Sequence, residues 1–174
     1  MIDTISSTLA PYYLQIKFVH LLFVAMWFWS TSVAYTYYLV PLFRAWQQNP
    51  QALDRIHLRN WAMERFDDGA ILEHIAFPIV LLTGILLMLI SGWSPDAGWF
   101  ALKLVLVVLV FLPIEIVDYH LAHFGGNKQK LRESGAIEEY EDILRLHWKF
   151  LVLSTPIVVV SITLVVFLAI TKPF

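Results

Sequence analysis

Cysteine is absent from the 174-residue sequence. Its absence excludes structural disulfides, thiolate zinc sites, iron–sulfur clusters, thioether-linked haem and cysteine nucleophiles. Charge is scarce as well: Asp, Glu, Lys and Arg make up 15% of the chain, whereas an ordinary soluble domain has about 25%. The formal net charge is −2, so the composition gives no reason to expect a nucleic-acid partner.

Hydrophobic residues are abundant and are gathered into long runs. They make up 59% of the chain, and the mean hydropathy is +0.67. Each run reaches the ~20 residues that an α-helix needs to cross a bilayer, where backbone polar groups must be satisfied within the helix. The sequence therefore predicts an all-α integral membrane four-helix bundle, up-down-up-down, as one transmembrane domain over residues 1–174. The predicted spans are about 13–40, 70–90, 99–121 and 146–170, joined by cytoplasmic segments 41–69 and 122–145.

Lysine and arginine are distributed unevenly between the two ends of this predicted bundle. Nine of the 12 lie in or beside the two long connections, and only Lys17, Lys103 and Lys172 lie toward the other end. Cytoplasmic loops carry the excess of basic residues in membrane proteins. We therefore expect both long connections in the cytoplasm and both termini outside, in a multi-pass protein of a cell inner membrane.

The connections are expected to contain structure of their own. Pro50–Phe66 mixes apolar residues with arginines, a pattern typical of a helix that lies on the membrane surface. Ser134–Leu144 is expected to extend the fourth helix into the cytoplasm. Gly125–Gly126 is expected to end the third helix, and Pro113 and Pro156 are expected to kink the third and fourth helices.

Two ionisable residues lie inside the apolar runs near the predicted outer surface. His20 is about two turns into the first span and Lys103 about one turn into the third, which places them at similar depth. Such groups are functional candidates because they are costly to insert without a partner. His20 could ligate haem iron and Lys103 could pair with a propionate or an anionic substrate. Alternatively, Lys103 snorkels to the interface and His20 forms an interhelical hydrogen bond.

A denser group of acids and histidines lies at the predicted cytoplasmic ends of the second, third and fourth spans. The topology brings these ends to one membrane face, where carboxylates and imidazoles suit a first-row transition metal or a haem with two histidine ligands. The alternative is interfacial pairing with nearby arginines and lysines. The candidate ligands are His74, Glu115, Asp118, His120 and His147. The candidates for catalysis are Lys103, Glu115 and Tyr119, and Tyr119 could act in proton or electron transfer.

Two further features of the spans concern packing. Trp27 belongs to an aromatic group in the first span that could contact a flat macrocycle or a quinone, or could simply face lipid. Thr83–Gly84 in the second span is a pair of small residues that lets two helices approach closely.

Each of the four predicted spans contains a short motif. Leu14–Phe28 contains Lys-x-x-His ending at His20 and then Trp-Phe; Leu-Thr-Gly-Ile-Leu-Leu surrounds Thr83. Trp-Phe-Ala-Leu-Lys ends at Lys103, Asp-Tyr-His begins at Asp118, and Pro156 and a terminal Lys-Pro-Phe follow. Together these motifs resemble the HemJ-type protoporphyrinogen IX oxidase family. The first span is also similar to copper-resistance-D-like four-helix membrane domains.

The resemblance implies a small inner-membrane haem b protein. Its reaction would be the six-electron oxidation of protoporphyrinogen IX to protoporphyrin IX, with the electrons passed toward quinone. His20 would be the haem ligand, Lys103 the second functional residue, and the expected small molecules are porphyrin-like or quinone-like.

Other functions stay open at this point. The cytoplasmic histidines and carboxylates could belong to a protein that binds or transports a transition metal such as copper. A third hypothesis is a protein that acts in interaction or assembly and catalyses no reaction. The lipid bilayer is an expected partner in every case, and the sequence leaves a homo-oligomer open.

The distribution of basic residues generates a first prediction, on topology. A reporter fused after Phe174 should be active in the periplasm, because the predicted outer side carries few lysines and arginines. Reporter pairs that are active on opposite sides of the membrane measure this directly. A cytoplasmic signal at Phe174 would contradict the predicted orientation.

Overall fold

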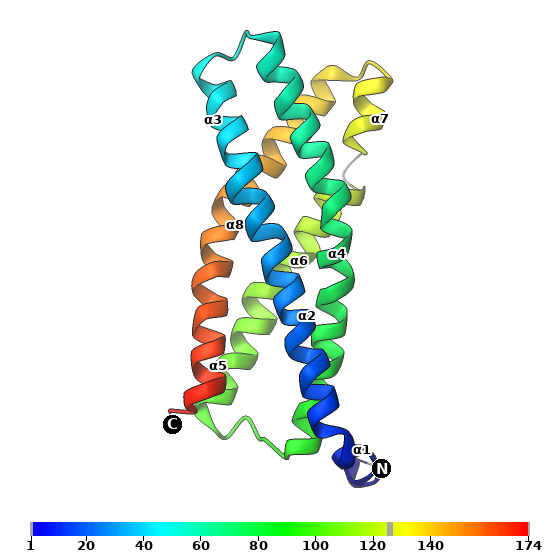
Figure 1. Cartoon of the computed structure of the whole chain (residues 1–174), viewed down its shortest axis with the longest axis vertical. Coiled ribbons are helices and arrows are strands. Elements are labelled where there is room, and N and C mark those ends of the chain that lie inside the picture. The colour runs from blue at the N-terminus through cyan, green and yellow to red at the C-terminus, as the bar shows by residue number, and fades with distance from the viewer. Residues whose placement is uncertain (1, 125–126, 174) are drawn as a thin grey trace.

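The protein consists of helical rods that run side by side in the computed structural model, which describes residues 2–124 and 127–173 (Figure 1). No strand occurs in these two ranges. The predicted end of the third helix at Gly125–Gly126 lies outside the described residues. In chain order the helices are α1 (Ile2–Leu9), a 3-10 turn (Ala10–Tyr12), α2 (Tyr13–Ala34), α3 (Val40–Gln48), α4 (Leu53–Ser91), α5 (Gly98–Leu106), α6 (Leu112–Tyr119), α7 (Lys128–Glu133) and α8 (Ile137–Thr171).

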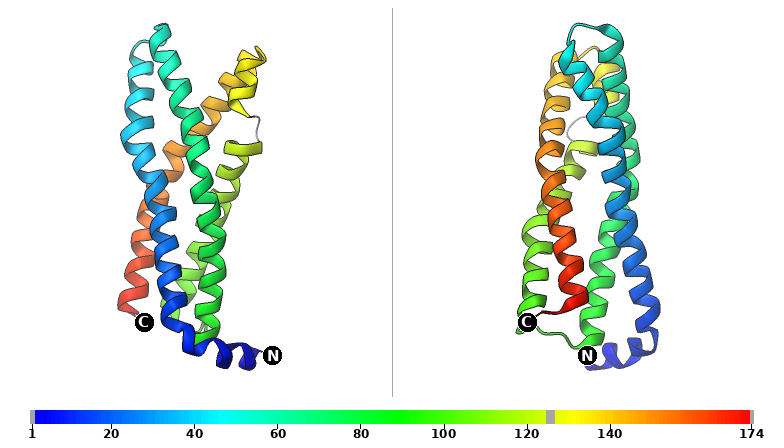
Figure 2. Two further views of the ribbon diagram at one scale, coloured as in Figure 1. Left: turned by 45° about the vertical axis from the view of Figure 1, so that its right-hand side comes forward. Right: turned by 60° about the vertical axis from the view of Figure 1, so that its left-hand side comes forward.

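The rods alternate in direction, and both ends of the chain lie at the same end of the bundle, as two further views agree (Figure 2). We call this the terminal end, and the opposite end, where α3 meets α4 and α7 meets α8, the loop end. Over the described residues, 4 helical stretches are long and apolar enough to cross a membrane. They cover Ser6–Gln48, Leu53–Ser91, Gly98–Glu133 and Ile137–Thr171. The predicted all-α four-helix membrane bundle is confirmed.

The connection between α4 and α5 at the terminal end is short, as the sequence predicts. Gly92 ends α4 in the left-handed conformation with φ of 63°, which a residue without Cβ adopts at little cost. Its N–H donates to the Met88 carbonyl at 3.1 Å. Ser94 and Asp96 then close the turn through a side-chain hydrogen bond of 2.6 Å.

Three π-helical turns interrupt the rods at Tyr35–Leu39, Val107–Phe111 and His120–Phe124. The first two are followed directly by helices with a proline in their first turn, Pro41 in α3 and Pro113 in α6. Proline cannot donate the next backbone hydrogen bond, so the ladder changes register at these positions. The helix α6 lies between two such turns, and each turn alters which face of the rod points into the bundle.

The segment 50–66 differs from the sequence prediction. It does not form a separate helix on the membrane surface, because from Leu53 onward it is the first part of the continuous helix α4. Met63 and Phe66 are buried against α8 and the first rod, so the apolar face of this stretch packs against protein. The predicted extension of the fourth helix is confirmed, since α8 begins at Ile137.

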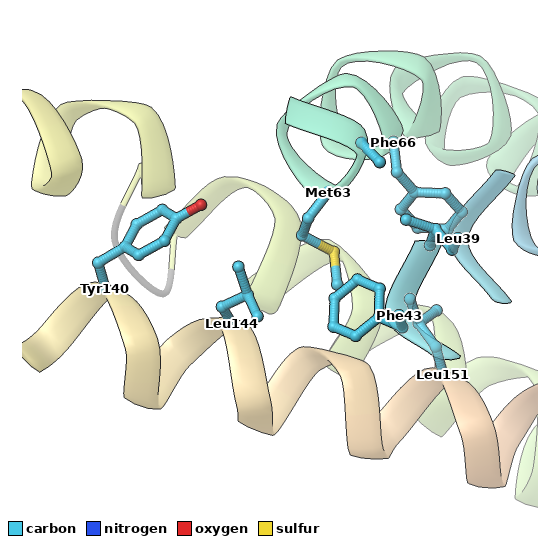
Figure 3. Packing of buried hydrophobic residues seen from close by; sticks show 8 residues of the cluster. Leu39, Phe43, Met63, Phe66, Tyr140, Leu144 and Leu151 are labelled. Atoms are coloured by element: carbon cyan, nitrogen blue, oxygen red, sulfur yellow. The ribbon is translucent and has the colours of Figure 1, made fainter. Parts of the chain in front are cut away.

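Buried apolar side chains form separate clusters along the axis of the bundle. At the loop end, Phe43, Met63 and Leu144 are wholly buried in one such cluster (Figure 3). The outward faces are equally apolar: Leu153 is 69% exposed and Ile170 is 76% exposed. In water so much exposed apolar surface would be unfavourable, whereas in a bilayer it faces lipid tails.

Arg59 ties three helices together at the loop end. Its guanidinium is 1% exposed, stacks over the Trp46 ring at 4.4 Å, and forms an ion pair with Glu141 at the start of α8. It also donates to Asn60 Oδ1 at 2.7 Å. Glu141 is therefore not a free surface acid, since it is the partner of a buried cation.

The Arg59 contacts generate a prediction about stability. Arg59→Met keeps the apolar stem but leaves Glu141 without its buried partner, so the free energy of unfolding should fall by ~2–3 kcal/mol, less than for a fully buried pair. Denaturant titration in detergent micelles measures the loss. The matched control is Arg55→Met, whose exposed pair with Asp54 spans 3.6 Å and should contribute less than about 0.5 kcal/mol. Equal effects of the two substitutions would contradict the assigned role of Arg59.

Candidate functional site

An apolar cavity of about 280 Å³ lies between α2, α4, α5 and α8 in the terminal half of the bundle. Aliphatic and aromatic side chains from all four helices form most of its wall. Trp99 and Phe100 begin α5 on one side, and their rings pack at 5.5 Å between centroids. A concave, mostly apolar site with a few polar groups is the usual form of a small-molecule site.

Apart from Tyr13 and the tryptophan indoles, the polar side chains that line this cavity are basic. Lys103 and His20 both line it, so the prediction that they lie at similar depth is confirmed. Lys103 is half-buried and has no hydrogen bond or ion pair with the residues that the structure describes. Lys17 and Lys172 are exposed members of the lining, and Lys172 lies over the Trp93 ring at 4.7 Å. No acid lines the cavity among residues 2–124 and 127–173, so an anion would meet only positive charge there.

The hydrogen bond of His20 fixes which of its ring nitrogens is free. Thr83 Oγ1 donates its only proton to the Ile79 carbonyl at 2.6 Å. The bond of 2.9 Å between Thr83 Oγ1 and His20 Nδ1 must therefore be donated by the imidazole. It follows that neutral His20 carries its proton on Nδ1 and presents an unprotonated Nε2, which is the state in which histidine binds a metal.

Gly84 gives the His20 ring its place between α2 and α4. A Cβ at Gly84 would lie 3.4 Å from His20 Cε1 and 3.9 Å from its Nδ1. The Thr83–Gly84 pair thus does more than let two helices approach. Thr83 orients the imidazole and Gly84 leaves room for it.

Trp27 separates the cavity from a second polar region deeper in the bundle. Its ring lines the cavity and packs on Phe77 and Phe111 with centroids 5.3 and 5.2 Å away. Its indole Nε1 donates to Glu115 Oε1 at 2.6 Å. Glu73 on α4 lies beside Glu115, within reach of a hydrogen bond between the two carboxyl groups. The predicted candidates Trp27 and Glu115 are therefore direct partners, although only Trp27 lines the cavity.

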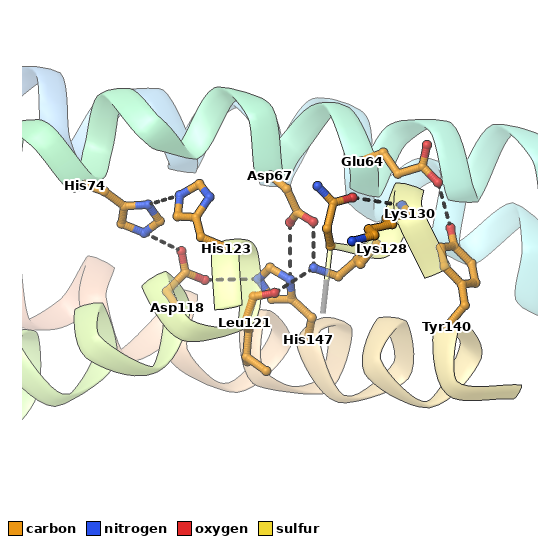
Figure 4. Close-up of polar contacts among 11 residues, drawn as sticks. Glu64, Asp67, His74, Asp118, Leu121, His123, Lys128, Lys130, Tyr140 and His147 are labelled. Atoms are coloured by element: carbon orange, nitrogen blue, oxygen red, sulfur yellow. Dashed lines mark hydrogen bonds and ion pairs between the residues drawn. The ribbon is translucent and has the colours of Figure 1, made fainter. Parts of the chain in front are cut away.

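The second polar region is a buried chain of acids and bases from three rods (Figure 4). Asp118 on α6 is its junction, since its two oxygens bind His74 Nε2 at 3.2 Å and His147 Nε2 at 3.1 Å. His74 Nδ1 meets His123 Nε2 at 2.9 Å. The sequence prediction that side chains of α4, α6 and α8 gather at one site is borne out for His74, Asp118 and His147.

The chain continues beyond His147 toward the loop end. His147 is wholly buried, and its Nδ1 lies 3.4 Å from Asp67 Oδ1. The other Asp67 oxygen accepts a bond of 2.6 Å from Lys128 Nζ, which also donates to the Leu121 carbonyl at 2.9 Å. Lys128 is 2% exposed, so this cation belongs to the interior and not to a solvated loop.

Two predicted residues take no part in the hydrogen bonds of this region. His120 is exposed and has no hydrogen bond or ion pair within the described parts of the chain, so its expected place among the ligands is corrected. His123, one π-helical turn later, contacts His74 instead. Tyr119 is 45% exposed and packs edge-on against His74 at 5.0 Å, so it covers the histidines from outside and is remote from the cavity.

The arrangement of the polar chain favours hydrogen bonding over metal coordination. The Nε2 atoms of His74 and His147 both face Asp118, and His74 Nδ1 faces another imidazole. Among residues 2–124 and 127–173, no three His, Cys, Asp or Glu side chains are arranged to hold one ion. Of the ligands predicted from the sequence, His74, Asp118 and His147 thus form hydrogen bonds with one another.

Sequence reasoning missed Asp67, Lys128 and the role of Thr83. Asp67 and Lys128 were assigned to connecting segments by hydropathy, and only the length of α4 and the packing of α7 bring them inside.

Comparisons of the chain with family models, with curated proteins and with solved structures give no match.

The geometry of His20 generates a prediction about its tautomer. In protein labelled with ¹⁵N-histidine, the His20 signals at neutral pH should be those of the Nδ1–H form, because Thr83 can only accept. Thr83→Val removes that acceptor and should shift the ring toward a mixture with the Nε2–H form. Thr163→Val is the matched control, since Thr163 makes the same kind of bond to the Val159 carbonyl at 2.8 Å on an exposed face. An Nε2–H signal in the unmodified protein would refute the assignment.

Proposed function

We propose that the chain is a haem b-binding oxidoreductase of the inner membrane that oxidises a porphyrinogen, as the HemJ-type protoporphyrinogen IX oxidases do. The observation that carries this proposal is the unprotonated Nε2 of His20 at an apolar cavity whose charged side chains are all lysines. Haem and protoporphyrinogen IX share the chemistry that such a cavity would recognise. Both are flat or puckered apolar macrocycles that carry propionate groups.

The residues of the cavity fit a haem group chemically. His20 would hold the haem iron through its unprotonated Nε2, and its Nδ1–H bond to Thr83 is the outer contact that typically orients a metal-binding imidazole. When bound, haem would supply one-electron transfer. The remaining wall is aliphatic and aromatic, which keeps water away from a macrocycle and leaves carboxylates to be bound by the lysines.

The lysines are suited to hold carboxylates at the edge of the site. Lys103 is the strongest candidate, because it is half-buried and has no anionic partner among the described residues. A carboxylate beside it would pair with a charge that already lies in a poorly solvated place, where pairing is stronger than at an open surface. Lys17 and Lys172 at the rim would attract the same anions from the aqueous side.

The metal-transport alternative has less support from the geometry. Its ligands were expected at the loop end, where His74, Asp118 and His147 bind one another. A transported ion would have to displace these buried hydrogen bonds before it could be held.

The haem proposal is tested by absorption spectroscopy on protein purified from a haem-replete host. The preparation should show a Soret band, and His20→Ala should abolish or shift it while the protein remains in the membrane. His57→Ala is the control, because His57 is exposed and lies in the loop-end half of α4. A Soret band that is unchanged in His20→Ala, or absent from the unmodified protein, would contradict the proposal.

The substrate class is tested separately through Lys103. Lys103→Met should raise KM for protoporphyrinogen IX by about tenfold, which corresponds to ~1.4 kcal/mol, with a smaller effect on kcat. Lys149→Met is the control, since Lys149 is exposed on α8 away from the cavity. Equal KM values for both variants would show that Lys103 does not bind the substrate carboxylates.

A further inference from the structure

The buried acids and bases behind Trp27 form two neighbouring groups: Glu73 and Glu115 beside the cavity, and a hydrogen-bonded group centred on Asp118. The series begins behind Trp27 at Glu73 and Glu115, and Asp118 follows three residues after Glu115 on α6, one helical turn away. From Asp118 it passes to His74 and then to His123, which is half-buried. The series therefore leads from the floor of the cavity to a histidine that reaches the surface of the bundle.

The direction of each hydrogen bond follows from the acceptor at the junction. An ionised Asp118 has no proton to donate, so His74 and His147 both donate to it from Nε2. Neutral His74 then has an unprotonated Nδ1, which accepts from His123 Nε2–H at 2.9 Å. These donors all point toward Asp118, which is the order that proton transfer from the surface inward requires.

A position for one further proton lies between His147 and Asp67. With its proton on Nε2, neutral His147 has a bare Nδ1 that faces Asp67 Oδ1 at 3.4 Å. Both atoms are buried and have no hydrogen-bond partner among the residues that the structure describes. Two acceptors facing each other in a buried site are unfavourable, and a proton on Nδ1 would satisfy both.

The charges agree with this extra proton. Asp67 and Asp118 are buried carboxylates, and Lys128 is the one buried cation in direct contact with either of them within residues 2–124 and 127–173. The group then has a net charge of −1 while His147 is neutral, and a proton on His147 brings it to zero. Since an uncompensated charge in the interior is costly, the arrangement has a place for one mobile proton.

The other end of the series is suited to hold a proton. Glu73 and Glu115 are buried beside each other, and two like charges at one buried site repel, so a proton on one of the two carboxyl groups is favoured. Glu73 Oε2 is buried and has no partner among the described residues, so it is free to accept. Trp27 holds Glu115 Oε1 and keeps the pair directly behind the cavity.

We propose that these side chains form a proton relay between the cavity floor and the surface of the loop-end half. The carriers, in order from the floor, are the Glu73–Glu115 pair, Asp118, His74 and His123, and the His147–Asp67 contact stores one proton beside Asp118. This function goes beyond the proposed oxidation and does not require haem.

The transfers balance at every step. A proton that binds His123 at Nδ1 releases the Nε2 proton to His74 Nδ1, and His74 then gives its own Nε2 proton to Asp118. Asp118 passes the proton to Glu115 by side-chain rotation or through one water. Each step breaks one N–H or O–H bond, forms another and moves no electron, so the reverse sequence delivers protons from the floor to the surface.

Infrared spectroscopy tests the relay in the whole protein, reconstituted in lipid. The protonated Glu73–Glu115 pair should give a carboxylic acid C=O band that Glu115→Gln alters or removes. When H₂O is replaced by D₂O, this band shifts at a rate set by proton access to the pair. Asp118→Asn and His123→Phe should each slow the shift by roughly tenfold or more, because each removes a carrier.

The matched control is Asp54→Asn, an exposed acid at the start of α4 whose ion pair with Arg55 lies outside the series. It should exchange as fast as the unmodified protein. His123→Phe decides the outcome if Asp118→Asn does not fold, since His123 is only half-buried. Equal exchange rates in His123→Phe and the unmodified protein, or the absence of a carboxylic acid band, would overturn the relay. Haem content plays no part in either readout, so failure of the relay and failure of the haem proposal are distinguishable.

Discussion

Lipid cannot hydrogen-bond, so every polar side chain that enters the hydrocarbon region must find its partner inside the bundle. The placement of Asp118 depends on this constraint. Its two oxygens are each taken by an imidazole, one from α4 and one from α8. The same contacts bring three rods together at one depth, so the need to satisfy one buried carboxylate both positions the helices and creates the polar chain.

The four-helix membrane fold could be predicted from the sequence because it depends on the lengths of apolar runs. The common depth of His20 and Lys103 was also predictable, since a fixed rise per residue sets depth in helices that start at the same end. The sequence did not predict that α4 continues without a break from Leu53, because a helix on the membrane surface and a helix packed against protein share one amphipathic pattern. Nor does hydropathy reveal that Lys128 is buried, since its partner Asp67 is 61 residues away in sequence.

The structure brings His123 into the polar chain and leaves the predicted ligand His120 outside it, for a more specific reason. An unbroken α-helix would present one constant face, whereas π-helical turns stand on both sides of α6. The turn before α6 alters the face that Glu115 and Asp118 present. The turn at His120–Phe124 shifts the register again, so that His123 points to His74 and His120 does not. Pro113 marks the first change of register, but the second turn has no comparable signal in the sequence.

Basic and acidic side chains inside the bundle are separated along its axis. At the terminal end the cavity is lined by lysines and His20, with no acid in its described lining, so it attracts anions. Behind Trp27 the sign of the charge is reversed, because the buried carboxylates outnumber the buried cations there. If an oxidation takes place in the cavity, as proposed, it would release electrons and protons together, and the acids behind Trp27 would accept only the protons. Under the proposed function, a substrate drawn in by lysines would be oxidised on one side of Trp27 while its protons leave on the other, so a single indole would separate the two products of the reaction.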